Sequence, residues 1–96
     1  MSSEEITRAH YDDLEFDDDL ALLDDVPFTG IVYADYPDGK SEVEFNYVEG
    51  LRSGIQKLWY SNGQLEMEWQ AVRGQGSDWS REWAEDGTLI RETKDR

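Results

Sequence analysis

The side chains of this 96-residue chain that could do chemistry are mostly carboxylates. There are 23 aspartates and glutamates, but only one histidine, His10, and no cysteine. Catalytic triads and histidine-based metal sites need more than one imidazole. A pair of carboxylates can hydrolyse glycosides, but its acid member needs a desolvated pocket, and a chain this short buries little of its surface. We therefore expect a protein that is not an enzyme, with no catalytic residues and no cofactor.

Several carboxylates are grouped near the N-terminus in a pattern that invites comparison with calcium-binding loops. They are Asp12, Asp13, Asp17, Asp18, Asp19, Asp24 and Asp25. An EF-hand loop needs a glycine at its sixth position and a glutamate at its twelfth. This segment contains no glycine. We therefore expect a solvated acidic turn and no metal site.

The formal net charge of −14 restricts the partners of the protein. Binding to a nucleic-acid backbone needs clustered lysine and arginine, and an anionic membrane surface repels an acidic protein. A basic protein, by contrast, would be attracted and would associate quickly. The expected partner is therefore another, basic protein, without direct nucleic-acid or membrane binding. The lack of cysteine and of a long apolar run fits a cytoplasmic protein.

The elements that must position these side chains follow a 24-residue repeat. Glycines and glutamates recur at this spacing along most of the chain. The recurring positions are Gly30 and Gly54; Gly39, Gly63 and Gly87; Gly50 and Gly74; and Glu44, Glu68 and Glu92. A fixed period with glycine at fixed phases is typical of a repeat protein. The expected units are about 28–51, 52–75 and 76–93.

Each unit contains two strand-like runs joined by a turn with glycine. The turn sequences are Pro-Asp-Gly at 37–39, Ser-Asn-Gly at 61–63 and Glu-Asp-Gly at 85–87. Asn-Gly and Asp-Gly favour the two-residue type I′ turn of a β-hairpin. The expected fold is all-β, an antiparallel meander of repeated β-hairpins in a single curved sheet with an N-terminal capping segment.

The N-terminal residues lie outside the repeat. We expect residues 1–10 to form a flexible arm and residues 11–96 to form a single repeat domain. Residues 11–27 allow either a hairpin around Asp17–Asp19 or a short helix over 19–25 with an aspartate cap. The hairpin is favoured, because this segment leads into a sheet whose edge needs cover.

Two-residue turns would set the pairing of every hairpin. On one face of the sheet, the expected pairs are Val32 with Phe45, Gln56 with Trp69, Leu58 with Met67, Tyr60 with Leu65 and Ala84 with Leu89. On the opposite face, they are Asp35 with Glu42, Lys57 with Glu68, Trp59 with Glu66, Arg81 with Glu92 and Trp83 with Ile90. The first face is apolar; it also carries Ala34, Tyr36, Val43 and Tyr47. It must be covered by the N-terminal segment, by curling of the sheet or by a second copy.

The opposite face mixes charge with large aromatic side chains. Tryptophan and tyrosine are enriched in binding hot spots, so this face is the predicted partner-binding surface. The predicted partner-binding residues are Tyr33, Glu44, Trp59, Glu66, Glu68, Trp79 and Trp83. The alternative is that the glutamates only face solvent and that the tryptophans stack to stiffen a one-layer sheet.

Two stretches of the units, PFTGIVYADYPDGK and SGIQKLWYSNGQLEMEW, resemble MORN-type repeats (membrane occupation and recognition nexus). The chain is most similar to the bacterial variant in YwqK-like proteins, which are antitoxin components. The matching positions are Gly54, Trp59, Tyr60, Asn62, Gly63, Gln64, Leu65 and Gly74. The likeness covers about residues 27–90. Asp35, Asp78 and Ala84 depart from the pattern, the last two as in a terminal capping repeat.

This resemblance implies a bacterial antitoxin or immunity protein. Together with the charge, it leads us to expect a non-catalytic protein-binding module that docks on a basic toxin and occludes the surface for an anionic substrate. Lys57, Arg73 and Arg81 are too scattered for the phosphoinositide binding attributed to some MORN repeats. The alternative is a structural or assembly module that self-associates through its apolar face or its sheet edge, as a homodimer.

Overall fold

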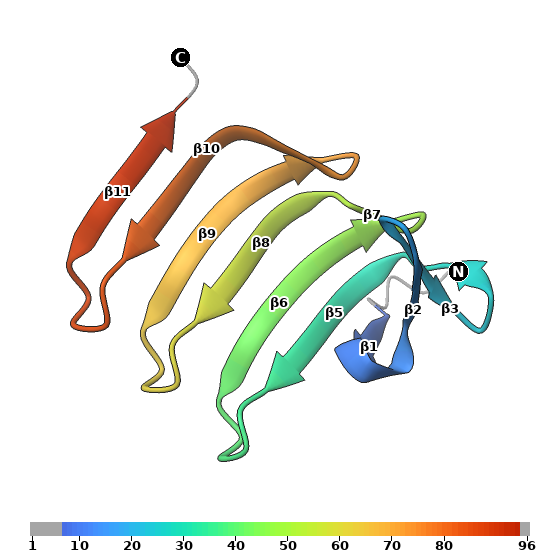
Figure 1. The fold of residues 1–96 in the computed structure, drawn as a ribbon, viewed down its shortest axis with the longest axis horizontal. Helices are drawn as coiled ribbons and strands as arrows, with labels where there is room; N and C mark the ends of the chain where they lie inside the picture. Colours follow the sequence, from blue (N-terminus) through green and yellow to red (C-terminus); the bar gives the residue numbers. More distant parts are fainter. Residues whose placement is uncertain (1–6, 95–96) are drawn as a thin grey trace, which may run out of the picture.

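The computed structural model describes residues 7–94, and the side chains of all of these except residues 76–78. The described chain is all-β, with an eight-stranded, mostly antiparallel sheet and a small three-stranded sheet (Figure 1). In chain order the elements are β1 (Arg8–His10), the 3₁₀ turn η1 (Tyr11–Asp13), β2 (Glu15–Asp17), β3 (Leu20–Leu23), β4 (Val26–Pro27), β5 (Gly30–Asp35), β6 (Ser41–Val48), β7 (Leu51–Arg52), β8 (Gly54–Trp59), β9 (Leu65–Val72), β10 (Gln75–Trp83) and β11 (Leu89–Lys94).

The large sheet is open and follows the predicted meander. Its strand order is β1-β5-β6-β8-β9-β10-β11, and the short β7 also pairs with β6. Only β1 runs parallel to its neighbour, β5. The small sheet has the order β2-β3-β4. The all-β, antiparallel expectation is confirmed, whereas the expectation of one single sheet is wrong.

The predicted pairing holds in the middle of each hairpin. Val32 lies opposite Phe45, Leu58 opposite Met67 and Arg81 opposite Glu92. Near the hairpin tips every ladder shifts by one residue. The observed partners there are Ser41 for Asp35, Leu65 for Trp59 and Leu89 for Trp83, so the predicted pairs Asp35–Glu42, Trp59–Glu66, Tyr60–Leu65, Trp83–Ile90 and Ala84–Leu89 are wrong.

A longer turn causes this shift. The Tyr60 N–H donates to the Gln64 carbonyl and the Gly63 N–H to the Tyr60 carbonyl. Gly63 has a φ of 93°, whereas Asn62 keeps a negative φ. This is a three-residue loop closed by a glycine bulge, not the expected two-residue type I′ turn. The Asn62 side chain stabilises it by accepting the Gln64 N–H at 2.8 Å, and an aspartate does the same in the other two tips.

The two-residue type I′ turn expected at the hairpin tips occurs instead at the links between units. In the first link Glu49 and Gly50 have φ values of 49° and 87°. In the second, Arg73 and Gly74 have 52° and 87°. Positive φ at both central residues is the mark of a type I′ turn. Gly50 and Gly74 therefore form the turns of the links, just as Gly39, Gly63 and Gly87 form the turns of the hairpin tips.

The N-terminal segment forms the small sheet and one strand of the large sheet. β2 and β3 form an antiparallel hairpin joined at residues 18–19, so the favoured interpretation of residues 11–27 is confirmed and the helix over 19–25 is wrong. Arg8–His10 lie in β1 beside β5, not in the expected flexible arm. Residues 1–6 of that arm lie outside the described residues.

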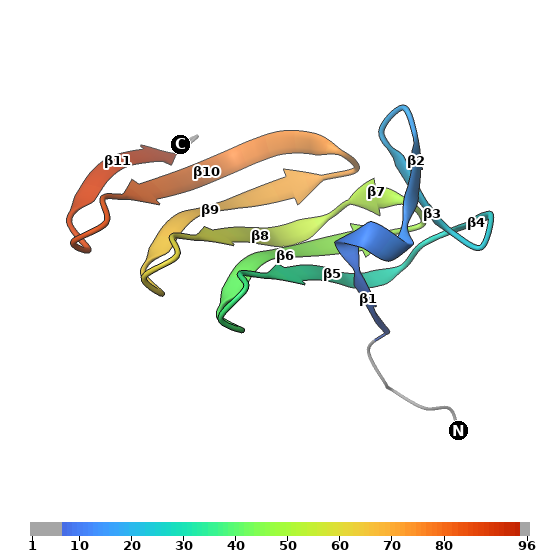
Figure 2. The ribbon, with the colours of Figure 1, turned by 60° about the horizontal axis from the view of Figure 1, so that its bottom comes forward.

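The main core lies where the small sheet meets the large one. Its buried side chains are Ala9, Leu14, Ala21, Phe28, Val32, Phe45 and Tyr47. Figure 2 shows β2 and β3 standing over the end of the large sheet beside β5, β6 and β7. The turn at Gly50 fixes the small sheet, because its N–H donates to the Phe28 carbonyl and its carbonyl accepts the Ala21 N–H. Gly50 has a φ of 87°, which strains any residue with a side chain, and a Cβ there would also displace Leu20, whose Cδ1 would lie 2.4 Å away.

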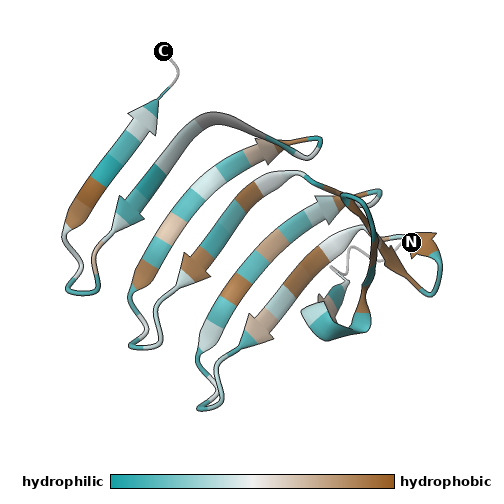
Figure 3. Ribbon diagram, in the orientation of Figure 1, coloured by the Kyte–Doolittle hydropathy of each residue, from teal (hydrophilic) through white to brown (hydrophobic). Residues whose placement is uncertain are grey.

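The apolar face fades along the sheet. Val32 and Phe45 in the first unit correspond to Gln56 and Trp69 in the second, and to Ser80 and Thr93 in the third. In the next row, Val43 and Leu58 give way to an ion pair between Glu82 and Arg91. Figure 3 shows brown bands on β5 to β9, a hydrophilic end of β10 where the strand is coloured, and one further brown band at the start of β11. The small sheet therefore needs to cover only the first part of the face.

Gln56 is fully buried where the first two hairpins separate. The ladder between β6 and β8 contains only the Val43–Leu58 and Glu44–Lys57 pairs, because the end of β6 pairs with β7. In the gap, Gln56 Oε1 accepts the Asn46 N–H at 3.0 Å and Nε2 donates to the Asn46 carbonyl at 3.1 Å. The side-chain amide therefore takes the place of a backbone partner.

The hairpin tips are joined by tyrosines. The Tyr36 hydroxyl donates to the Trp59 carbonyl at 2.6 Å, and the Tyr60 hydroxyl donates to the Trp83 carbonyl at 2.7 Å. Desolvation raises the pKa of both tyrosines, and nearby glutamates, including Glu66, raise it further. Each unit is thus tied to the next at its tip, and the corresponding position of the third unit is alanine.

We predict that Gln56→Leu lowers the free energy of unfolding by about 1–3 kcal/mol, because the Asn46 N–H loses its acceptor, while the Asn46 carbonyl keeps only the Ser53 N–H. Urea unfolding followed by tryptophan fluorescence measures this. The matched control is Gln75→Leu, at an exposed position, which should change stability little. Equal stability of the two variants would contradict the bridging role.

We also predict that the protein loses stability in alkali through Tyr36 and Tyr60. The folded state favours the neutral form of both tyrosines. Their contribution to the free energy of unfolding is therefore complete below the ordinary pKa of 10.0 and is lost as pH rises through the raised pKa. The loss should be smaller in the Tyr36→Phe/Tyr60→Phe variant. Urea unfolding at a series of pH values compares the two proteins, and identical pH profiles would refute the prediction.

Candidate protein-binding surfaces

One face of the large sheet carries a straight row of alternating charges. The row contains neighbours in register on successive strands, namely His10, Tyr33, Glu44, Lys57, Glu68, Arg81 and Glu92. From Glu44 onward each carboxylate lies beside a cation. Opposite charges facing each other across a ladder stabilise it, so this row helps to hold the sheet in register.

Arg81 is the centre of the strongest part of this row. Its Nε lies 2.9 Å from Glu92 Oε2 and its Nη1 lies 3.7 Å from Glu68 Oε1. The guanidinium also lies over the Trp79 ring, 5.0 Å from its centroid. The hydrogen bond from Arg81 lowers the pKa of Glu92. These carboxylates are therefore engaged within the sheet.

The structure divides the predicted partner-binding residues into two groups. Tyr33, Glu44 and Glu68 share the charged row, and Trp79 lies beside it with its Nε1 3.1 Å from Gln70 Oε1. Glu66 and Trp83 instead line a hollow of about 130 Å³ near the hairpin tips. The remaining predicted residue, Trp59, ends β8 and is half-buried, as are the other two predicted tryptophans.

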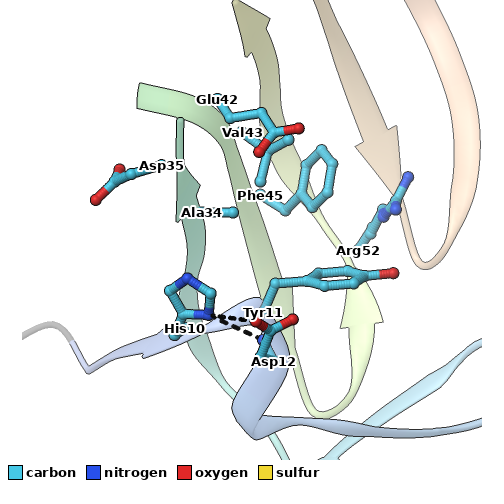
Figure 4. Close-up of a pocket in the computed structure, with 9 residues that line it drawn as sticks. All are labelled: His10, Tyr11, Asp12, Ala34, Asp35, Glu42, Val43, Phe45 and Arg52. Atoms are coloured by element: carbon cyan, nitrogen blue, oxygen red, sulfur yellow. Dashed lines mark hydrogen bonds and ion pairs between the residues drawn. The ribbon is translucent and has the colours of Figure 1, made fainter. Parts of the chain in front are cut away.

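Another hollow, which the sequence did not reveal, lies between η1 and the large sheet (Figure 4). Its volume is about 450 Å³. The residues that line it are His10, Tyr11, Asp12, Ala34, Asp35, Glu42, Val43, Phe45 and Arg52. We call it the η1 cleft. It combines an apolar floor on β5 and β6, an aromatic wall and several acidic side chains.

Arg52 closes one side of the η1 cleft. Its guanidinium lies 4.2 Å from the centroid of the Phe45 ring, and its Nε donates to the Tyr47 hydroxyl at 3.2 Å. Within residues 7–94 it forms no ion pair with a carboxylate. Arg52 and Tyr11 also line a second hollow of about 440 Å³ beside Asp18 and Asp19. The two side chains therefore separate two neighbouring hollows.

The acidic side chains of the η1 cleft come from two parts of the chain. Asp12 is fixed beside β1, since its N–H donates to His10 Nδ1 at 3.0 Å. Glu42 comes from β6, and in Figure 4 Phe45 lies between Glu42 and Tyr11 while Asp35 points away. The adjoining residues 11–27 contain eight carboxylates and no basic side chain. The cleft therefore suits a cation with an aliphatic stem.

Sequence reasoning missed the η1 cleft because its walls lie outside the repeat. Tyr11 precedes the first unit, and Arg52 stands where the neighbouring units have Phe28 and Gly76. This exception to the repeat was the available signal. Nothing in the sequence places Tyr11 near Arg52, because a 3₁₀ turn of three residues has no periodicity.

In the described part of the chain, no cluster of three histidine, aspartate or glutamate side chains is arranged to hold a metal ion. Between residues 7 and 94 no helix has the length and apolarity needed to cross a membrane. Searches against protein-family models, curated proteins and solved structures found no match to this chain.

We predict that Arg81→Gln raises the pKa of Glu92 toward its ordinary value of 4.5, because the hydrogen bond that favours the carboxylate is lost. The stability that this carboxylate contributes is present above pH 4.5 and disappears as pH falls through the lowered pKa. The variant should therefore lose less stability in acid than the wild-type protein. Titration of the Glu92 carboxyl by NMR measures the pKa. Arg91→Gln, which removes a cation paired with Glu82, is the control and should shift Glu92 less. An unchanged Glu92 pKa in the Arg81 variant would contradict the assignment.

Proposed function

We propose that this chain is a non-catalytic, acidic protein-binding module whose partner is a basic protein. The observation that carries the proposal is the η1 cleft, an apolar floor with acidic sides beside a small sheet that has carboxylates and no cations. The net charge of −14 steers a basic partner toward the protein. The cleft then supplies the short-range contacts that a general negative field lacks.

The partner would anchor a lysine or arginine side chain in the η1 cleft. Its aliphatic stem would lie against Val43 and Phe45, and its charge would lie near Glu42 and Asp12. Arg52 would donate to a carbonyl or carboxylate of the partner and so fix the orientation of the bound segment. Anchors of this kind contribute most when they fill a pocket at the centre of an interface.

The 24-residue hairpin units, tied together by repeated tyrosine hydrogen bonds, support the resemblance to MORN-type repeats of the bacterial YwqK-like variant. From this resemblance we propose an antitoxin or immunity protein of a bacterial cytoplasm. It would act by covering the basic surface with which a toxin binds an anionic substrate. A fold alone does not specify a task, so the charge and the cleft must support this role.

The predicted surface around Trp59, Trp79 and Trp83 is the second candidate for the partner. Its support is the combination of half-buried tryptophans with Glu66 near the hairpin tips. The internal pairing of Glu68 and Glu92 with Arg81 favours the η1 cleft over this surface, because those charges are already neutralised.

The test compares two variants of equal charge. Asp12→Asn/Glu42→Gln neutralises the η1 cleft, and Asp24→Asn/Asp25→Asn neutralises the exposed turn between β3 and β4. Proteins captured from lysate of the native host are identified at low and moderate salt, and the captured basic protein is then purified and titrated. We expect at least tenfold weaker binding by the cleft variant and a small change for the control.

Two results would contradict the proposal. If wild-type protein captures no basic protein at either salt concentration, the proposed function fails. If both variants weaken binding equally, the attraction comes from net charge, and the η1 cleft is not the site.

A further inference from the structure

β11 is an open edge at a position where the other units bind a strand. Each second strand of a hairpin pairs with the first strand of the next unit, as β6 does with β8 and β9 with β10. β11 follows β9 by one repeat, but within residues 7–94 its only partner is β10. All six of its residues are exposed. An unpaired strand of this kind is ready to accept another strand.

The charges on β11 restrict which strand fits. Along the sheet, Glu44 faces Lys57 and Glu68 faces Arg81, so a cation is expected opposite Glu92. Within β11, the sequence Glu92 to Lys94 reads negative, neutral, positive. Read in reverse, the same sequence places an opposite charge at every charged position. β11 is therefore complementary to an antiparallel copy of itself.

Only one symmetric register gives this complementarity. Centred on Thr93, an antiparallel pair sets Glu92 opposite Lys94 of the second copy, and the symmetry gives this contact twice. Centring on Arg91, Glu92 or Lys94 would set each of these residues opposite its own copy. Like charges directly opposite each other destabilise a ladder, so the charges select the register around Thr93.

We propose that two copies of this protein associate through β11, antiparallel and centred on Thr93. A two-fold axis perpendicular to the sheet keeps equivalent faces on the same side. The charged row then runs on from Arg81 and Glu92 to Lys94 of the second copy. The two large sheets become one continuous sheet.

The third unit suits a second copy better than a further repeat. Tyr36 and Tyr60 tie the tips of the first and second units to the next hairpin. The third unit has Ala84 at this position and offers no hydroxyl. The edge thus keeps the charged ladder but lacks the tie for another hairpin tip. In the Thr93 register no hairpin tip of the second copy lies beside Ala84, so no tyrosine hydrogen bond is needed there.

We expect the two copies to associate weakly. One strand pair buries less surface than a stable interface requires, and two chains of net charge −14 repel each other. Sedimentation should therefore show association that rises with protein concentration. This proposal does not depend on the binding of a basic partner.

Charge exchange tests the register. Lys94→Glu sets Glu92 opposite a glutamate and Glu92→Lys sets a lysine opposite Lys94, so each variant alone should dimerise at least tenfold more weakly than wild type. An equimolar mixture of the two should form a heterodimer, because every charged contact is then complementary. Lys40→Glu, with the same charge change on an exposed residue far along the sheet, should dimerise like wild type. A monomeric wild type, or a Lys94→Glu variant that associates like Lys40→Glu, would overturn the proposal.

A cross-link provides a second test that does not alter the charges. The chain has no cysteine, so Thr93→Cys introduces one thiol per chain, and the register sets the two thiols opposite each other at a spacing that a disulfide can bridge. With oxidised glutathione, this variant should form covalent dimers at least tenfold faster than Ile90→Cys, whose exposed thiol does not face its copy. Equal rates would exclude the Thr93 register. Circular dichroism confirms that each variant is folded.

Discussion

The side-chain amide of Gln56 makes the connection on which the large sheet depends. β6 leaves β8 to pair with β7, so the backbone ladder between the first two hairpins is short. Gln56 fills the gap from a fully buried position by exchanging hydrogen bonds with both backbone groups of Asn46. A buried amide is tolerated only when its polar atoms are satisfied. The same residue therefore joins two units and fixes how their strands separate.

Three kinds of contact join neighbouring units, each at a different position along the hairpins. The amide of Gln56 acts near the links, the charged row acts across the middle, and the tyrosine hydroxyls act at the tips. A one-layer sheet with a core at only one end needs contacts of this kind, because burial cannot hold the distant units. Side chains that look suited to binding, such as Glu68 and Trp79, are thus partly engaged in holding the sheet together.

The sequence predicted the hairpins and their central register, because the repeat period and the alternation of apolar residues are strong signals. It did not predict the turn type. Asn62 can either adopt a positive φ in a two-residue turn or accept the Gln64 N–H from its side chain, and the sequence is compatible with both. The parallel strand β1 and the cleft at Arg52 depend on contacts between distant segments. No local pattern encodes such contacts, so they were missed together with the second sheet.

The two ends of the sheet are built for different neighbours. At the first end the small sheet covers Val32 and Phe45 and brings an acidic segment with it. At the other end the small sheet covers nothing, Leu89 and Ile90 are exposed, and within residues 7–94 β11 has one unpaired backbone edge. Pairing through β11 would place the η1 clefts of two copies at opposite ends of one sheet and on the same side. A partner in the cleft and a second copy at the edge therefore would not compete, and the acidic field would be doubled along one surface.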